Sequence, residues 1–580
     1  MPDHLAPGVY VEENDFRAKP IVGVGTSTAA FVGPTRKGPC LARANAHDTP
    51  ELLTSFGDFE RTYGTFADLG YTPATNYLAH GVRAFFHEGG SRLYVSRVVG
   101  AGATAASGNV TAPGTPPAQA VAFQARFPGA VGNGRILVRE VLAPVARAAM
   151  SDAPTGSLLT TGTGAATTWH LKVGATWHPA ARPGDAAEDL ATLAAASPRL
   201  ATLAVNARDA DGAELRHEGL GFDRRHPLWV GHVLSGTPER RVDHLQNLFA
   251  IRIGANVSAL ELRNALFDRA ATNAAGELEA SFRLEAGSDG AAPAAADYAL
   301  ALGALAGLED ISTVAAPGAS AYADAEAIQN LLIAHAEAPR AYRIAVLDLP
   351  PDQLPGQVRT LRGRIDSRYA AIYYPWVVVA NPLARPGRRD IPRELVLPPS
   401  GFVCGIYARN DAERGVWKAP ANEIVRSALR FSLDIDSAEQ ELLNPIGVNC
   451  LRSRRGLRVW GARLASSAPE WQYVNLRRYC NYLESSIDRG TQWAVFEPNG
   501  ERLWAAVQQT IAEFLHNEWR NGALLGSKPE AAFFVRCDRS TMTQHDLDNG
   551  RLVCLIGAAA IKPAEFVVFR IGQRTGDARP

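Results

Sequence analysis

The chain has 580 residues, which is too long for one compact core, so we expect two to four domains. Lys and Arg together number 59, and Asp and Glu together also number 59, so the formal net charge is zero. This balance argues against a nucleic-acid-binding protein, which usually carries a basic excess. The hydrophobic share of 46% and the charged share of 20% are ordinary for a soluble globular protein.

Three further features of the sequence indicate the compartment. The six cysteines form no C-x-x-C pair, and several stand in apolar runs, as free buried thiols do in a reducing compartment. The opening "MPDHLAPGVYVEEN" has neither the basic nor the apolar region of a signal peptide. No apolar run reaches the length of about 18 residues that suggests a membrane helix. We therefore expect synthesis and assembly in the cytoplasm and no membrane insertion.

The first predicted element is a strand without a neighbour. In "GVYVE", which begins at Gly8, Val9 and Val11 share one face while Tyr10 and Glu12 share the other. A polar stretch over residues 13–20 separates this strand from the rest of the chain. Because a lone strand is unstable, it must pair with a sheet elsewhere, in this chain or in another.

The next segment predicts a mixed α/β unit. The run "TAAFVGP" is typical of a strand, "TNYLAHGVRAFFHEGG" of a helix that stops at Gly89-Gly90, and "RLYVSRVV" of a second strand. Residues 298–400 then alternate strand and helix patterns, which predicts a wound, largely parallel sheet. Residues 401–455 look loop-rich.

Two other parts of the chain differ from this pattern. Residues 101–297 hold short strand-like runs, and Gly-, Ala- and Pro-rich stretches bracket them, which suggests an inserted β-rich domain. From residue 456 on, helices such as "GERLWAAVQQTIAEFLHNEWRNG" and strands such as "AAFFVRCD" and "EFVVFRIGQ" predict an α+β domain. The expected fold class is α/β and α+β multidomain, with a wound mixed-sheet core. The expected parts are an N-terminal arm (1–22), an α/β core domain (23–100 with 298–455), an inserted domain (101–297) and a C-terminal domain (456–580).

The sequence offers no convincing catalytic or ligand-binding motif. The phosphate loop GxxxxGK[ST] and the nucleophile elbow GxSxG do not occur, and "GAGATA" at 100–105 leads into Pro/Gly-rich chain instead of a helix. Four histidines near Asp243 lack a metal-ligand spacing, and Asp434 and Asp436 lack a partner base. We therefore expect no catalytic residue, no metal and no cofactor. The four histidines are His217, His226, His232 and His244.

Two other readings of the chain remain open at this point. A hydrolase with a wound α/β domain is supported by the alternation at 298–400, with Asp348 and Asp352 as its carboxylates. A cell-surface assembly protein is supported by the β-rich insert. The basic runs at 452–456 and 476–480 favour contact with an acidic protein neighbour, or solvation, over contact with phosphate.

Several longer blocks carry a family resemblance. They include "GFVCGIYARNDAERGVWKAPAN" from residue 401, "LNPIGVNCLRSRRGLRVWGARL" (443–464), "YVNLRRYCNYLESSI" (473–487) and "EPNGERLWAAVQQTIAEFLHNEWRNGALLGSKPEAAFFVRCD" (497–538). Together with "PGVYVEE" and "GVGTSTAAFVGPTRKGP" near the start, these blocks resemble the tail sheath proteins of contractile phages, R-type bacteriocins and extracellular contractile injection systems. Residues 101 to about 290 carry no block of this family.

The resemblance implies a structural subunit and no enzyme. Copies would stack as hexameric rings around an inner tube protein, between baseplate and cap proteins, and contract to drive the tube through a target envelope. A single chain holding both halves points to a phage tail or a released tail-like particle, since type VI sheaths use two chains. The metastable extended state would store the work, without nucleotide or nucleic acid. The insert would lie on the particle exterior.

The resemblance also implies strand exchange between subunits. An N-terminal and a C-terminal strand arm would complete β-sheets in adjacent copies, with residues 13–20 as a hinge. The candidate arm residues are Gly8, Val9, Tyr10, Val11, Glu12, Phe566, Val567, Val568, Phe569 and Arg570.

The C-terminal domain would line the lumen and grip the tube, and the helix around 500–521 is our candidate for that contact. Its apolar residues recur at helical spacing and should be buried: Leu503, Trp504, Val507, Ile511, Phe514 and Leu515. The candidate tube-facing residues on its other faces are Arg502, Gln509, Glu513 and Asn517, with Glu518 and Arg520 near the helix end. A solvated helix face is the equally weighted alternative.

Overall fold

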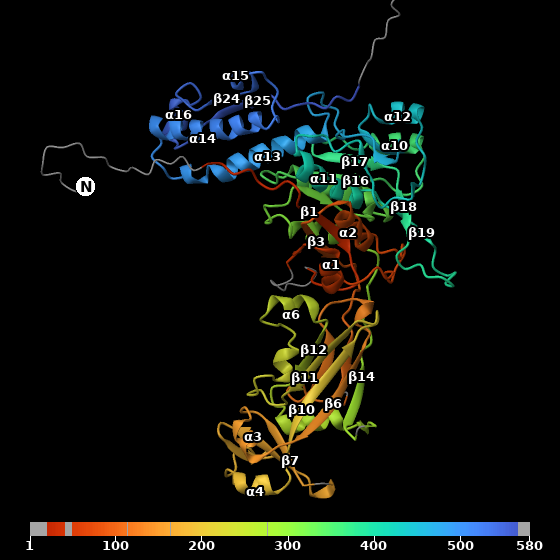
Figure 1. The fold of residues 1–580 in the computed structure, drawn as a ribbon, viewed down its shortest axis with the longest axis vertical. Coiled ribbons are helices and arrows are strands. Elements are labelled where there is room, and N and C mark those ends of the chain that lie inside the picture. Colours follow the sequence, from red (N-terminus) through yellow and green to blue (C-terminus); the bar gives the residue numbers. More distant parts are fainter. Residues whose placement is uncertain (1–19, 41–48, 113, 163, 275, 567–580) are drawn as a thin grey trace, which may run out of the picture.

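The computed structural model describes residues 20–40, 49–112, 114–162, 164–274 and 276–566. The molecule is elongated (Figure 1). A β-rich part built from the middle of the sequence forms one end, and the first and last parts of the chain form the other. Among the described residues, the nine-stranded sheet is the largest.

The nine-stranded sheet joins segments that are far apart in the sequence. Its order is β2-β3-β1-β15-β16-β17-β22-β23-β20. The pairs from β3 to β22 are parallel, and those at both ends are antiparallel. The predicted wound, largely parallel sheet is therefore present. Its strands are β1 (Ala29–Pro34), β2 (Glu51–Leu53), β3 (Leu93–Val98), β15 (Thr313–Ala315), β16 (Ile344–Asp348), β17 (Ala370–Tyr374), β20 (Glu423–Ile424), β22 (Val448–Ser453) and β23 (Leu457–Val459).

Helices cover both faces of this sheet. On β1, Phe31 points into the layer with α1 (Phe56–Tyr63), α2 (Tyr77–Glu88) and α11 (Ser400–Arg414). Ala30 and Val32 point into the opposite layer, with α8 (Ala295–Gly303), α9 (Ala325–Glu337), α10 (Pro355–Arg362) and α12 (Ser437–Leu443). Strands buried on both faces read as continuous apolar runs, which is why these strands were predictable.

Helix α2 stops where the sequence predicts, and a side chain also caps its start. The Asn76 side chain accepts a hydrogen bond from the Ala79 amide at the start. Gly89 ends the helix in the left-handed conformation, with φ 114°.

The loop-rich interpretation of residues 401–455 is wrong. Helix α11 occupies Ser400–Arg414 and is buried over its first eleven residues, Ser400 to Asn410. A helix enclosed on all sides shows no polar face, so its periodicity is hidden. Its glycines allow a close crossing with α2: a Cβ on Gly401 would lie 2.6 Å from Gly81 Cα, and one on Gly405 would lie 2.5 Å from the Phe85 carbonyl oxygen.

The middle of the chain forms two sheets of its own around one large apolar cluster, with a smaller cluster around Met150 and Trp177. The larger has the order β13-β14-β6-β10-β7-β8-β9 with β11 added on β10, and the smaller has the order β12-β5-β4. Its strands are β4 (Ser107–Asn109), β5 (Val121–Ala125), β6 (Arg135–Pro144), β7 (Leu158–Thr161), β8 (Thr168–Val173), β9 (Thr176–Pro179), β10 (Arg199–Arg208), β11 (Glu214–Leu220), β12 (Phe249–Ile253), β13 (Ala271–Thr272) and β14 (Leu278–Arg283). Its helices are α3 (Arg147–Asp152), α4 (Leu190–Ala195), α5 (Val230–Val233), α6 (Arg241–Gln246) and α7 (Ala259–Phe267).

The two soft stretches that bracket this part pair with each other. The Thr104 amide donates to the Ser288 carbonyl at 3.0 Å, and the Ala291 amide donates to the Ala101 carbonyl at 2.9 Å. The first stretch, expected to be a plain linker, also contains β4. The two chain crossings therefore form one narrow, hydrogen-bonded neck.

The last part of the chain packs two long helices against a small sheet. They are α13 (Val474–Gly490) and α14 (Glu501–Arg520), which lie side by side in Figure 1. The two-stranded sheet consists of β24 (Phe533–Arg536) and β25 (Leu555–Ala558), with α15 (Pro529–Ala532) and α16 (Gln544–Asp548) beside it. A further three-stranded sheet joins β18 (Val377–Ala380), β19 (Glu394–Leu397) and β21 (Arg430–Phe431). The hairpin β22–β23 spans residue 456, where the sequence predicts that the C-terminal domain begins. Strand β23 pairs with β22 and so belongs to the nine-stranded sheet.

Candidate functional site

The first described residues form an anchored strap along α13. Ile21 joins the apolar cluster of α13 and α14. The Val24 amide donates to Ser486 Oγ at 3.1 Å, and the Thr26 hydroxyl donates to Asp411 Oδ2 at 2.6 Å. A side chain at Gly23 would collide with the Tyr482 hydroxyl, 2.2 Å from an added Cβ. Residues 21–28, which we call the anchor segment, are therefore fixed to the last part of the chain.

A buried ion pair holds the middle of the anchor segment. Arg478 Nη2 lies 2.6 Å from Asp411 Oδ2, and both side chains are buried. The same Nη2 donates to the Thr26 carbonyl at 3.0 Å. Burial alone lowers the pKa of Arg478, but the Asp411 carboxylate outweighs it and raises that pKa above its ordinary value. The guanidinium is therefore a permanent cation that ties α11, α13 and the anchor segment together.

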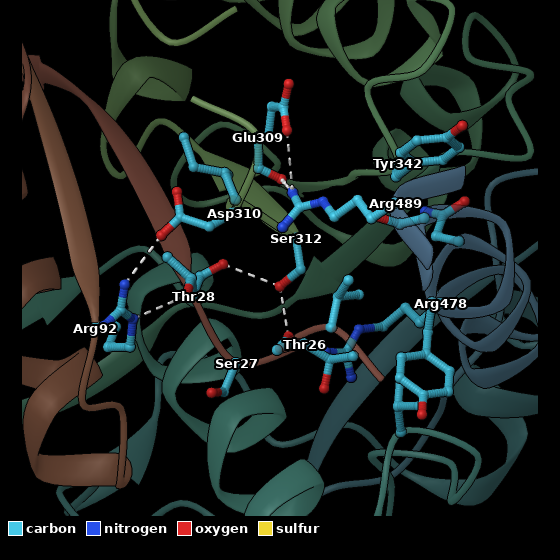
Figure 2. A pocket seen from close by; sticks show the side chains of 17 residues that line it. Thr26, Ser27, Thr28, Arg92, Glu309, Asp310, Ser312, Tyr342, Arg478 and Arg489 are labelled. Atoms are coloured by element: carbon cyan, nitrogen blue, oxygen red, sulfur yellow. Dashed lines mark hydrogen bonds and ion pairs between the residues drawn. The ribbon is translucent and has the colours of Figure 1, made fainter. Parts of the chain in front are cut away.

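A groove of about 210 Å³ runs beside the anchor segment (Figure 2). Its other arginines also face carboxylates: Arg92 Nη2 lies 3.0 Å from Asp310 Oδ2, and Arg489 Nη2 lies 3.8 Å from Glu309 Oε2. Because each of these cations already has an acidic partner, the groove lacks the spare charge that an anionic ligand needs. The ion pairs of the groove therefore join chain segments to one another.

The small sheet β24–β25 offers edges for strand addition. Within the described part of the chain, each strand is paired only with the other. Phe534 and Leu555 expose apolar side chains on this sheet. A two-stranded sheet is marginal by itself and gains from added strands. Its position makes it a candidate acceptor for strands of other copies.

Helix α14 presents its predicted polar residues to the outside. Five of the six predicted apolar residues are buried and Leu503 is half-buried. Arg502, Gln509, Glu513 and Asn517 are exposed, and Gln509 Nε2 donates to Glu513 Oε1 at 3.0 Å.

Glu518 was assigned wrongly to a polar face. It is buried and accepts hydrogen bonds from the Tyr482 hydroxyl at 2.9 Å and the Tyr479 hydroxyl at 3.1 Å. Burial raises the pKa of Glu518, while the two phenol donors act against that rise. Glu518 is therefore an internal link between α13 and α14.

Comparison with known proteins assigns the second half of the chain. Residues 291–463 match the model of the phage tail sheath protein central domain, and residues 466–574 match that of the phage tail sheath C-terminal domain. A prophage major tail sheath protein of Pseudomonas aeruginosa strain UCBPP-PA14 is 25% identical over 180 residues, 30% of this chain and 45% of that protein. The tail sheath protein of Enterobacteria phage T4 is 22% identical over 163 residues, 27% of this chain and 24% of that protein. The chain thus spans less than half the length of these curated relatives.

The fold is similar to that of solved sheaths over the whole chain. The contracted helical sheath of the anti-feeding prophage superposes with a TM-score of 0.52 at 20% identity, covering 99% of this chain and 100% of that one. The contracted PVC sheath, from an extracellular contractile injection system, superposes with a TM-score of 0.51 at 19% identity, covering 99% of both chains. Residues 291–463 and 466–574 therefore belong to the phage tail sheath family. The matched domains are those of structural sheath proteins.

The carboxylates considered for a hydrolase have structural partners in this sheath protein. Asp348 is buried at the end of β16 and accepts hydrogen bonds from the Ser400 amide at 2.7 Å and the Ser400 hydroxyl at 2.6 Å. Asp436 caps α12 by accepting from the Glu439 amide at 2.7 Å. Asp352 is exposed, in a left-handed turn with φ 58°.

The remaining chemical candidates are also accounted for in the sheath fold. No cluster of three or more metal-binding side chains occurs among the described residues, and His226 Nδ1 accepts from the Leu228 amide. The basic run at 476–480 is internal: Arg477 stacks between the rings of Tyr369 and Trp471. Cys404, Cys450, Cys480, Cys537 and Cys554 are thiols outside any disulfide. Of the helices in the described ranges, none combines the length and apolarity needed to cross a bilayer.

Part of the predicted sheath site lies outside the described residues. The predicted site residues outside the described ranges are those of the N-terminal arm, Gly8, Val9, Tyr10, Val11 and Glu12, and those of the C-terminal arm, Val567, Val568, Phe569 and Arg570. The predicted hinge also lies outside them, except for residue 20. Phe566 is described; it is exposed and outside any strand. Sequence reasoning missed the anchor segment, for which the available signal was the run of small polar residues "GVGTST" before β1.

Proposed function

We propose that this protein is the structural subunit of a contractile sheath, which polymerises as stacked rings around an inner tube and contracts to drive that tube through a target envelope. The observation that carries the proposal is the sheath fold, similar over 99% of the chain to a sheath solved in its contracted state. The two sheath family models over residues 291–463 and 466–574 support it independently.

The proposed partners are copies of this chain, the inner tube protein, and baseplate and cap proteins. The particle is a phage tail or a released tail-like particle, assembled in the cytoplasm. Subunit contacts supply the work of contraction, since each copy adds a modest gain in buried surface and many copies act together. The proposal needs no cofactor, nucleic acid or membrane insertion.

We propose that four parts of the chain have different roles. Residues 1–22 are the N-terminal arm, residues 23–100 with 298–455 the core, residues 101–297 an exterior domain, and residues 456–580 the C-terminal sheath domain. The separate apolar clusters support the division between core and insert, because the clusters on the nine-stranded sheet and the insert cluster share no residue. Val459, Leu464 and Val474 also pack in a core cluster, so the core extends beyond residue 456. The exposed residues of α14 are the proposed tube contact.

In the proposed linkage, residues 8–12 and 566–570 add strands to the β24–β25 sheet of neighbouring copies. The open edges of that sheet supply main-chain donors and acceptors for such strands. The anchor segment supports this role, because it ties the base of the N-terminal arm to α13 through Ile21 and Val24. A force on the arm would therefore be transmitted directly to the C-terminal domain.

Deletion of residues 1–20 tests the proposal, because it removes the arm and leaves Ile21 and the anchor contacts in place. We expect the purified full chain to form tubes of stacked rings in negative-stain electron microscopy. The truncated chain should remain folded and soluble but form no tubes. Its melting curve by circular dichroism is the control for folding. Normal tubes from the truncated chain would contradict the strand exchange, and absence of tubes from the full chain would contradict the sheath function.

A further inference from the structure

The turn before α14 displays a side chain that the isolated subunit does not use. Phe496 is 102% exposed, and the neighbouring Val495 is exposed as well. The Phe496 backbone has a φ of 69°, a left-handed conformation that is strained for any residue other than glycine. An aromatic ring left in water on a strained backbone is a cost to the folded monomer, and such sites are concentrated at binding surfaces.

The turn holds the backbone of Phe496 in a fixed position. The Val495 amide donates to the Gln492 carbonyl at 3.2 Å, and the Glu497 amide donates to the Ala494 carbonyl at 3.3 Å. On the far side, Trp504 Nε1 donates to Asn499 Oδ1 at 2.7 Å, which ties the turn to α14. The backbone that carries the ring is therefore ordered before any partner arrives, so docking needs to order only the torsions of the side chain itself.

A complementary hollow lies at the other end of the same helix. Its volume is about 650 Å³, and Trp519, Leu524, Leu525 and Ile561 contribute its apolar lining. Leu525 is 65% exposed there. Trp519 is held in place because its Nε1 donates to the Gly526 carbonyl at 2.9 Å. The hollow thus offers an apolar surface of the kind that an aromatic ring fills.

The charges around the two features are of opposite sign. Glu497 is exposed directly beside Phe496. Arg520 lines the hollow and is exposed, and Lys528 is exposed immediately after the lining residue Ser527. Opposite charges at the rim favour correct docking and speed it.

The ring and the hollow cannot meet within one chain. Helix α14 has 20 residues and therefore holds them about 30 Å apart. We propose that Phe496 of one copy inserts into the α14 hollow of the next copy, with Glu497 beside Arg520. Each copy has one ring and one hollow, so this contact is head-to-tail and repeats from copy to copy. It rests on the proposed self-assembly of the chain and adds a contact that uses neither terminal arm.

The first test is Phe496→Ala in the full chain, polymerised without tube protein. Because Phe496 is the aromatic anchor of the proposed contact, its loss should raise the concentration needed for polymerisation by about tenfold or more. Leu300→Ala on α8, where Leu300 is also exposed, is the matched control and should leave that concentration unchanged. Light scattering and electron microscopy give the readout.

The second test is a charge exchange. Glu497→Arg and Arg520→Glu should each weaken polymerisation, and the double variant should recover it. A photoreactive benzoylphenylalanine at position 496 should crosslink to residues 519–527 or 561 of another copy.

The outcomes separate this inference from the function that it rests on. If the unaltered chain does not polymerise, the proposed function fails. If the unaltered chain polymerises and Phe496→Ala does so at the same concentration, only the docking contact is overturned. It is also overturned if Phe496→Ala lowers tube occupancy alone, or if the crosslinks map to the tube protein, since Phe496 would then contact the tube.

Discussion

Asp348 shows how a single buried group positions a helix in this sheath protein. Its carboxylate receives the amide and the hydroxyl of Ser400, the first residue of α11. Burial raises the pKa of Asp348 to about 7, against the hydrogen bonds from Ser400, which lower it. The carboxyl group therefore changes its protonation near neutral pH while remaining enclosed.

This pKa predicts a pH dependence of stability. Between about pH 4 and pH 7 the folded chain keeps a proton on Asp348 that the unfolded chain releases, so the free energy of unfolding falls as pH rises through this window. The slope from this group is at most about 1.4 kcal/mol per pH unit, and above about pH 7 its contribution is constant. Asp348→Asn should remove this slope. The measurement is urea unfolding from pH 4.5 to pH 8.

The exposed neighbour Asp352 supplies the control for that experiment. Asp352→Asn should follow the same pH profile as the unaltered chain, because its side chain faces water. An Asp348→Asn profile parallel to that of the unaltered chain would show that the carboxyl group does not titrate in this window.

The crossing of α2 and α11 shows how two elements depend on the absence of side chains. A Cβ on Gly401 would overlap Gly81, and a Cβ on Gly81 would lie 2.8 Å from Pro317 Cβ. Close backbone approach lets both helices lie on one face of the nine-stranded sheet. The glycines weaken the local helix signal of α11, and tertiary packing compensates for that loss.

Gly401→Ala should therefore destabilise the chain, although alanine is the better helix former. The added Cβ would lie 2.6 Å from Gly81 Cα, so the helices must separate, at a cost of about 1–3 kcal/mol. Gly356→Ala in α10 is the matched control, because an added Cβ meets nothing within 4 Å there. That control should stabilise the chain by about 0.5–1 kcal/mol. Denaturant unfolding measures both, and equal shifts would contradict the close crossing.

Helix α14 carries a prediction about the tube. Arg502→Glu combined with Glu513→Lys reverses two exposed charges and keeps the net charge. If this face grips the tube, the double variant should lower tube occupancy at low salt while sheath-only polymers persist, and the native contact should weaken as salt rises. Co-assembly with the tube protein, followed by electron microscopy, gives the occupancy.

A matched reversal on the insert serves as the control for α14. Glu214→Arg with Arg216→Glu exchanges a neighbouring exposed pair on β11 and should leave tube occupancy unchanged. Unchanged occupancy in the α14 variant at every salt concentration would move the predicted contact to the basic residues at 452–458.

At the scale of the whole molecule, the insert is joined to the core by buried charges as well as by the neck. Arg36 in the core lies 2.7 Å from Asp211 and 3.3 Å from Asp289, both in the insert. Asp289 also accepts the Gly70 amide at 3.0 Å and the Ala130 amide at 2.9 Å. These ion pairs and hydrogen bonds fix the orientation of the insert relative to the core.

Replacing residues 102–290 with a short Gly/Ser linker should leave a folded chain that still forms tubes. The linker can be short because the Ala101 carbonyl and the Ala291 amide already lie within 2.9 Å. Arg36 loses its insert partners in this variant, but it also regains water. Circular dichroism and electron microscopy supply the measurement, and a chain that unfolds would show that the insert is part of the core.

A point substitution provides the contrast. Asp289→Ala in the full chain removes one acid while the insert keeps Arg36 buried, so it should cost about 3 kcal/mol of stability. Glu218→Ala, at an exposed position of β11, should cost little. If Asp289→Ala is as mild as Glu218→Ala, the buried charges do not hold the insert.

The sequence by itself determined the elements whose signals are local. Helix α14 was predicted with most of its buried and exposed residues, and α2 with its final glycine, because periodicity and capping act within a few residues. The buried strands of the core sheet were predicted from their continuous apolar runs. The family followed from blocks in the second half of the chain, which the sheath models also match.

Only the tertiary structure decided where the buried charges find their partners. Arg478 pairs with Asp411, 67 positions away, and Arg36 pairs with Asp211, 175 positions away, so no local pattern could reveal either pair. The same holds for Glu518. The helical pattern placed it on a polar face, but in the structure it accepts hydrogen bonds from two tyrosines of α13. Helix α11 was missed because a helix buried on every side has no polar face to mark its period.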